Sequence, residues 1–252
     1  MNEKLQAFDR LLTIMDELRE KCPWDKKQTF ESLRNLTIEE AYELADAILE
    51  KDINGIKEET GDLLLHMVFY ARIASEKGAW DIADAINDTC EKLINRHPHI
   101  YGDLKVENAD EVKQNWERLK KKEGKKSVLS GVPISLPAMI KAHRMQDKTA
   151  QVGFEWENTD QVWEKVKEEM EELHEAVLDG TNKEHIEEEL GDLLISIVNY
   201  SRFLNIDPET ALEKANKKFK NRFEYIEQHA PKDLEDMTLE EMDKLWNESK
   251  SH

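Results

Sequence analysis

Glu39-Glu-Ala-Tyr-Glu43 forms an acidic block that is followed, after a gap, by Glu59-Thr-Gly-Asp62. The second half of the chain repeats both blocks as Glu168-Glu-Met-Glu-Glu172 and Glu189-Leu-Gly-Asp192. Glu39 and Glu168 are 129 positions apart, and Asp62 and Asp192 are 130 apart. One acidic cluster carries little information in an acidic protein. Two clusters with the same internal spacing indicate a duplicated unit with two candidate cation sites.

The first pair of blocks is predicted to lie on a helical hairpin. Thr37 and Glu40 have the spacing of a capping box at a helix N-terminus. A Glu40 side chain that caps a backbone amide cannot easily bind a cation as well, so we expect the helix to begin before Thr37. It should run to about Glu50, and a turn through residues 52–55 should lead into a third helix that includes Phe69.

Carboxylates on the two helices of each hairpin are expected to converge. Residues three positions apart share one helical face, as Glu40 and Glu43 do on the outgoing helix. The candidate metal ligands are Glu40, Glu43, Glu59 and Asp62 in the first half, and Glu169, Glu172, Glu189 and Asp192 in the second, where residues 178–182 form the turn. The alternative is that these residues only form solvated helix faces. The repeated spacing favours the cation sites.

Basic residues repeat together with the acidic blocks. Lys92 and Arg96 in the first half correspond to Lys218 and Arg222 in the second, and each pair is four positions apart on one helical face. Such residues can be ordinary partners in surface ion pairs. Because carboxylate clusters accompany them, we interpret Lys218 and Arg222 as groups that could offset the charge of a polyphosphate.

Helix-boundary signals repeat as well. Asp81 and Asp207-Pro208 predict the starts of the two basic helices. His97-Pro-His99 predicts a helix end at Pro98 rather than a zinc site, since no cysteine lies nearby. Candidate capping boxes are Asn108 with Glu111 and Thr238 with Glu241, each followed five residues later by Trp116 or Trp246.

The composition excludes several classes of protein. Nine Gly and six Pro in 252 residues leave few turn signals for a sandwich or barrel, so we expect an all-α fold of two tandem helical domains. A net charge of −19 argues against nucleic-acid binding. Cys22 and Cys90 are too few for a disulfide framework. Without an apolar stretch that could span a bilayer, we expect a cytoplasmic protein with no membrane contact.

The boundary between the two halves is expected near residues 125–135. Gly and Pro residues between Gly131 and Pro137 break any helix there, and the lysine run 120–126 before them reads as a solvated linker. The predicted organisation is an N-terminal domain at 1–125, a linker at 126–136 and a C-terminal domain at 137–252.

An all-oxygen set of ligands suits Mg²⁺, or Mn²⁺, better than zinc. Mg²⁺ in proteins typically bridges carboxylates to substrate phosphates, so metal-assisted attack on a phosphoryl group is the natural reaction class. The chain has no Gly-x-x-x-x-Gly-Lys-Ser/Thr loop and no Gly-x-Ser-x-Gly elbow. We therefore expect water as the nucleophile.

Several motifs together resemble the MazG family of tandem-domain nucleoside triphosphate pyrophosphohydrolases. They are the four acidic blocks, Cys22-Pro-Trp-Asp25-x-x-Gln28-Thr29, and Lys92-Leu-x-x-Arg96-His-Pro-His99. The resemblance spans nearly the whole chain. It implies an all-α homodimer with active sites built on four-helix bundles, and Mg²⁺-dependent hydrolysis of nucleoside triphosphates to monophosphates and pyrophosphate.

The resemblance also implies roles for residues of the second half. Its metal ligands are Glu169, Glu172, Glu189 and Asp192, which with Lys218 and Arg222 form the implied catalytic set. The implied nucleotide contacts are Lys165, Glu168, Glu188, Lys218, Arg222 and Trp246. His185 departs from the basic residue that is common in the family near the second block.

The two halves are not equivalent, because Leu36 stands where the second half has Lys165. A leucine offers no charge to a phosphate. We therefore expect the second domain to be the main catalyst. The alternative function is a non-catalytic helical dimer that binds nucleotide or an unknown protein partner, above all for the N-terminal domain.

Overall fold

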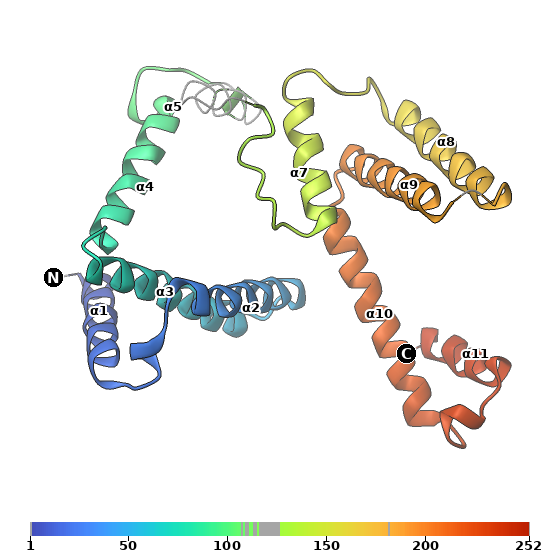
Figure 1. The fold of residues 1–252 in the computed structure, drawn as a ribbon, viewed down its shortest axis with the longest axis horizontal. Helices are drawn as coiled ribbons and strands as arrows, with labels where there is room; N and C mark the ends of the chain where they lie inside the picture. The colour runs from blue at the N-terminus through green and yellow to red at the C-terminus, as the bar shows by residue number, and fades with distance from the viewer. Residues whose placement is uncertain are drawn as a thin grey trace. The chain divides into compact units, whose positions relative to one another are not determined.

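A computed structural model of the chain describes residues 2–106, 108, 111–112, 115, 127–180 and 182–251 (Figure 1). These residues form helices and connecting turns without a strand, so the predicted all-α class is confirmed. The chain divides into two compact units, Met1–Trp116 and Glu117–His252. This division lies before the predicted boundary at 125–135, and residues 116–126 are not among those described. The exact boundary therefore stays a prediction.

The first unit is built around a hairpin of two long helices. Its elements are α1 (Glu3–Lys21), η1 (Asp25–Lys27), α2 (Phe30–Glu50), α3 (Ile53–Glu76), α4 (Ile82–Arg96) and α5 (Pro98–Tyr101). Thr29 caps α2 through a capping box with Ser32. The helix thus begins before Thr37, as predicted, and Glu40 is free of a capping role.

The turn of this hairpin is shorter than the sequence suggested. Lys51 adopts the left-handed conformation with φ of 58°, and Asp52 caps α3 by accepting a hydrogen bond from the Asn54 amide. The chain therefore reverses within Lys51 and Asp52, and Asn54 and Gly55 already lie in the first turn of α3. The prediction of a turn through 52–55 was wrong in this detail.

The core of the first unit joins α1, α2 and α3. Met15, Leu33, Val68, Phe69 and Ile73 are buried together. We call these five residues the first-unit core. Partly buried apolar residues, among them Leu36, pack against it.

The second unit contains the matching hairpin. Its elements are α7 (Ala138–Ala150), α8 (Thr159–Leu178), α9 (Lys183–Phe203), α10 (Pro208–His229), η2 (Leu234–Asp236), α11 (Leu239–Glu248) and η3 (Ser249–Ser251). The α8–α9 turn falls within the predicted range 178–182, and Gly180 in it has a φ of 61°. α7 packs against α9, and α10 contacts α7, α9 and α11. Val162 and Val166 on α8 and Val198 on α9 are buried.

The predicted helix boundaries agree with the structure. Asp81 and Asp207 are N-caps, with Pro208 in the first turn of α10. α4 ends at Arg96, directly before His97-Pro98. Thr238 and Glu241 form a capping box, and the Asn108 side chain accepts a hydrogen bond from the Glu111 amide. Trp116 lies outside the described residues.

Across the described residues, no helix combines the length and the apolar character needed to cross a membrane. Cys22 and Cys90 are both free thiols.

Candidate active site

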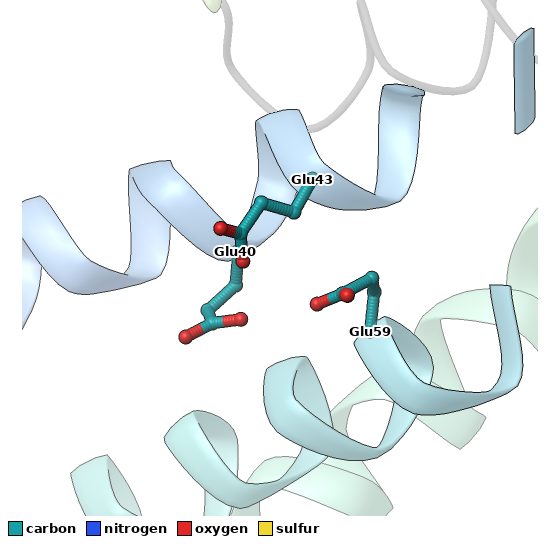
Figure 2. A group of neighbouring side chains, drawn as sticks. All are labelled: Glu40, Glu43 and Glu59. Atoms are coloured by element: carbon teal, nitrogen blue, oxygen red, sulfur yellow. The ribbon is translucent and has the colours of Figure 1, made fainter. Parts of the chain in front are cut away.

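The first carboxylate cluster lies between α2 and α3. Glu40, Glu43 and Glu59 each offer one oxygen, and these three oxygens lie within 4.8 Å of one another. Figure 2 shows the three side chains extending into the space between the two helices. The hairpin therefore converges carboxylates as its spacing predicted. Asp62, the fourth predicted ligand, falls outside this group.

Crowding of negative charge changes the protonation of this cluster. The pKa of Glu40 is raised from 4.5 to about 7, first because its burial disfavours the charged form and then because Asp62, Glu43 and Glu59 are also negative. The pKa of Glu59 is raised for the same reasons. Within the described part of the chain, no basic side chain pairs with Glu40, Glu43 or Glu59. A bound cation would relieve this repulsion.

The second cluster lies between α8 and α9 and contains Glu169, Glu172 and Glu189, again with ligand oxygens within 4.8 Å of one another. Glu169 is buried, with an exposed fraction of only 5 %. The pKa of Glu172 is raised, mainly by desolvation and then by the charge of Glu169. Asp192, the fourth predicted ligand, is exposed and falls outside the group.

Lys165 distinguishes the second cluster from the first. Its ammonium lies 2.7 Å from a carboxylate oxygen of Glu168 and 2.7 Å from one of Glu169. These hydrogen bonds raise the pKa of Lys165, which therefore stays charged. Leu36, its counterpart in the first unit, packs against the first-unit core instead. The asymmetry expected from the sequence is thus present in the structure.

The remaining predicted contact residues lie on other elements. Lys218 and Arg222 are on α10 and Trp246 is on α11, with the Arg222 guanidinium 5.4 Å from the centre of the Trp246 ring. Neither Lys218 nor Arg222 pairs with a carboxylate among the described residues. Glu188 is exposed, and one of its carboxylate oxygens lies 3.9 Å from Nδ1 of His185. The same nitrogen lies 3.5 Å from a carboxylate oxygen of Glu189.

The direction of α10 explains why the residues on α10 and α11 lie apart from the carboxylate cluster of the same unit. About 21 Å of helix separates Glu189 from Phe203, at 1.5 Å per residue. α10 then leaves the end of α9 and extends away from the α8–α9 hairpin (Figure 1). The structure therefore assembles the carboxylates and Lys165, but it does not bring Lys218, Arg222 or Trp246 to them.

A pocket adjoins the second cluster and was not foreseen from the sequence. It has a volume of about 540 Å³ and is lined by Lys165 and by Glu169 of the cluster. Its other walls come from α7, α8, α9 and the segment 153–156. Gln146 and Asn199, two of its polar residues, are distant in sequence from the acidic blocks, and only the tertiary packing of α7 on α9 brings them to the site.

Both clusters have the chemistry of a hard-cation site. Each offers three carboxylates and no sulfur ligand, a donor set that suits Mg²⁺. The pKa of Glu40 is raised first by desolvation and then by the neighbouring carboxylates, so a cation beside it would favour its charged form. The residues present therefore fit a divalent cation.

The pKa of Glu40 predicts a pH-dependent response to Mg²⁺. In the folded chain Glu40 keeps its proton up to about pH 7, whereas its ordinary pKa is 4.5. Its ionisation therefore weakens the folded state as the pH rises between these values, and a cation that needs the ionised carboxylate binds better above pH 7. We expect Mg²⁺ to raise the melting temperature more at pH 8 than at pH 6.

Glu40→Gln is the matched variant for this measurement, because its side chain stays neutral at every pH. It should lose part of the additional stabilisation by Mg²⁺ at pH 8. An identical Mg²⁺ response of wild type and Glu40→Gln at both pH values would contradict the assignment of Glu40 as a ligand.

Comparison with known families identifies the repeated unit. The family model described as the MazG nucleotide pyrophosphohydrolase domain matches residues 28–101 and again residues 158–227. Each match contains one carboxylate hairpin and the basic helix that follows it. The first match includes all of α4, and the second includes α10 up to residue 227.

Relatives align with nearly the whole chain. The nucleoside triphosphate pyrophosphohydrolase/pyrophosphatase MazG of Thermotoga maritima is 46% identical, over 99% of this chain and 98% of its own length. The nucleoside triphosphate pyrophosphohydrolase of Escherichia coli strain K12 is 41% identical, over 98% of each chain. The uncharacterized protein YabN of Bacillus subtilis is 45% identical over 98% of this chain, which spans 53% of that longer protein.

Proposed function

Since the chain belongs to the family of the MazG nucleotide pyrophosphohydrolase domain, we propose that it hydrolyses nucleoside triphosphates to monophosphates and pyrophosphate. We place the reaction at the second carboxylate cluster. The observation that carries this choice is Lys165, which supplies a charged ammonium beside Glu168 and Glu169 where the first unit has Leu36. A triphosphate needs such a cation in a strongly acidic protein.

Glu169, Glu172 and Glu189 would hold Mg²⁺ at this site. When bound, Mg²⁺ supplies positive charge for the phosphate oxygens and lowers the pKa of a water molecule. Asp192 is exposed on α9, one turn beyond Glu189, and would need to turn toward the cluster to add a fourth carboxylate. Mn²⁺ would fit the same oxygen donors.

The chain's own groups account for the orientation of the substrate. Lys165 is held between Glu168 and Glu169 and is therefore positioned at the edge of the cluster, where its ammonium can bind a phosphate oxygen. Glu172, whose pKa is raised by desolvation and by the charge of Glu169, lies in the same cluster and would accept a proton from an attacking water.

We also propose that two copies of the chain form a homodimer. Apolar side chains at helical spacing are exposed along α8 and α9: Met170 and Val177 on the first helix, and Leu190, Leu194 and Ile197 on the second. Such a stripe on a two-helix hairpin favours burial against a second hairpin, which produces a four-helix bundle. The partner could then supply Lys218, Arg222 and Trp246, which α10 directs away from its own cluster.

The products of the reaction test the proposed function. Incubation of the full chain with ATP and Mg²⁺ should release AMP and pyrophosphate in equal amounts, because attack occurs at the α-phosphorus. Separation of the products by anion-exchange chromatography measures this. Formation of ADP and orthophosphate would contradict the proposal.

The first unit favours a second, non-catalytic role. Its carboxylates converge as in the second unit, but Leu36 provides no cation for a phosphate. We propose that this unit binds a divalent cation and contributes to assembly or to recognition of a nucleotide or protein partner. Glu43→Ala should therefore leave the rate of pyrophosphate release close to that of wild type, because Glu43 lies outside the proposed reaction centre.

A further inference from the structure

Charged residues in two different settings line the pocket beside the second cluster. Lys165 and Glu169 belong to the proposed phosphate and cation site. The Arg202 guanidinium, by contrast, forms an ion pair with Glu155 and donates to the Asn199 side chain. Because Glu155 offsets the charge of Arg202, this pair does not attract a second phosphate. The lining other than Lys165 and Glu169 therefore favours an uncharged part of a ligand.

The apolar lining residues of the pocket suit a flat heterocycle. Phe154 and Trp156 line the pocket from the segment that connects α7 and α8, and Val162 and Ile195 line it from α8 and α9. Trp156 keeps an exposed fraction of 44 %, which leaves part of its ring surface available to a ligand. Aromatic rings bind nucleobases by stacking on their faces. A volume of about 540 Å³ lies in the usual range of small-molecule sites.

Gln146 provides a hydrogen-bond acceptor without a partner. Its Nε2 atom donates to the Ile195 carbonyl oxygen at 2.9 Å, which fixes the orientation of the amide because a carbonyl can only accept. Its Oε1 atom is buried and accepts no hydrogen bond among the described residues. A buried acceptor in a pocket wall favours a ligand that donates an N–H there.

The first unit shows that the fold does not need these polar groups. At the repeat offset of 130, Asn199 corresponds to Phe69 and Ser196 to His66. Phe69 is buried in the first-unit core, and His66 lies 2.7 Å from the Thr37 hydroxyl. Ser196, by contrast, is buried and lines the pocket, and its side-chain hydroxyl forms no hydrogen bond within the described part of the chain. Asn199 thus replaces an apolar core residue of the first unit, and Ser196 replaces a histidine that is hydrogen-bonded there.

We propose that this pocket binds the base of the nucleoside triphosphate, and that the Gln146 side-chain carbonyl accepts a hydrogen bond from an amino group of that base. This inference rests on the proposed function, because it assumes that the phosphates lie at Lys165. It makes Gln146 a specificity-determining residue for amino-bearing bases. A base with a carbonyl at the same position would place two acceptors against each other.

Two pairs of substrates isolate this hydrogen bond. ATP and ITP differ by an amino group in place of a carbonyl oxygen, as do CTP and UTP. We expect the wild-type kcat/KM to favour the amino member of at least one pair by about tenfold, the order of one hydrogen bond in a buried site. Gln146→Leu should abolish this preference by raising KM for the amino member, with hydrolysis of ITP and UTP retained.

Gln151→Leu is the matched control, since Gln151 is exposed at the end of α7 and does not line the pocket. It should keep the wild-type preference. Unchanged ratios of kcat/KM in Gln146→Leu, with normal hydrolysis, would overturn the assignment of the pocket. Absence of pyrophosphate release from every nucleotide would instead overturn the proposed function.

A second variant applies if Gln146→Leu does not fold. Trp156→Ala removes a partly exposed ring and should raise KM for all four nucleotides about tenfold through lost stacking, with kcat unchanged. Trp80→Ala, a change of similar exposure in the first unit, should leave KM unchanged. Equal KM values for Trp156→Ala and wild type would overturn the base-binding role of the pocket.

Discussion

Glu172→Ala is expected to lower the rate of pyrophosphate release from ATP by about 10²–10³-fold, the order found when one group that stabilises charge is removed from a reaction centre. Glu172 is central to the second cluster, because its oxygen lies within 4.8 Å of those of Glu169 and Glu189. Its loss removes a cation ligand and a candidate proton acceptor together. The measurement is the initial rate of pyrophosphate release at saturating Mg²⁺.

Glu43→Ala is the matched control, because Glu43 occupies the corresponding place in the first cluster and is equally exposed. Both variants should keep the wild-type helical content and melting temperature within a few degrees. If Glu43→Ala abolished pyrophosphate release and Glu172→Ala did not, the reaction centre would belong to the first unit.

Arg222→Ala is expected to lower the same rate by about 10²-fold, and a heterodimer with Glu172→Ala should recover much of it. The reason is that α10, the helix that carries Arg222, extends away from the α8–α9 hairpin of its own unit (Figure 1). If the partner supplies Arg222, a heterodimer of the two variants contains one complete site out of two. Its activity should therefore reach about half of the wild-type value.

Co-expression with two different affinity tags isolates this heterodimer, and its rate is compared with those of the two homodimers. Lys220→Ala paired with Glu172→Ala is a useful control, since Lys220 lies on the same helix but pairs with Glu224. That heterodimer should also reach about half of the wild-type activity, because Lys220 is not part of the site. A rate for the Arg222→Ala heterodimer no higher than that of either homodimer would show that Arg222 does not act across the interface.

The helical hairpins could be predicted from the sequence because their signals are local. Residues three positions apart share a helical face, so Glu40 with Glu43 already indicated the face on which ligands would lie. The start of α2 before Thr37 could also be predicted from neighbouring residues, because a helix that began at Thr37 would have used Glu40 in a capping box. The same reasoning located the caps Asp81 and Asp207.

Features that depend on tertiary packing or on an unusual backbone conformation could not be predicted from the sequence in the same way. The left-handed conformation of Lys51 shortens the α2–α3 turn, although lysine carries no strong turn signal. Asp62 and Asp192 share the spacing of the other carboxylates, but neither has an oxygen within 4.8 Å of all the members of its group. Asp62 nevertheless lies close enough for its charge to raise the pKa of Glu40.

The pocket illustrates the same limit. Gln146 reaches it only because α7 packs against α9, a contact between segments that are about fifty residues apart. One signal was nevertheless available in the sequence: Asn199 stands where the first repeat has the apolar Phe69. A polar residue at a position that is apolar and buried in the other repeat indicates a site at which the two units differ in function.

Hydrolysis of ATP by Glu43→Ala in oxygen-18 water tests the central claim most directly, because only the second cluster is intact in this variant. Attack of water on the α-phosphorus there predicts that the label enters AMP and that the released pyrophosphate stays unlabelled, as phosphorus NMR can show. Label in pyrophosphate, or ADP and labelled orthophosphate as the products, would contradict it.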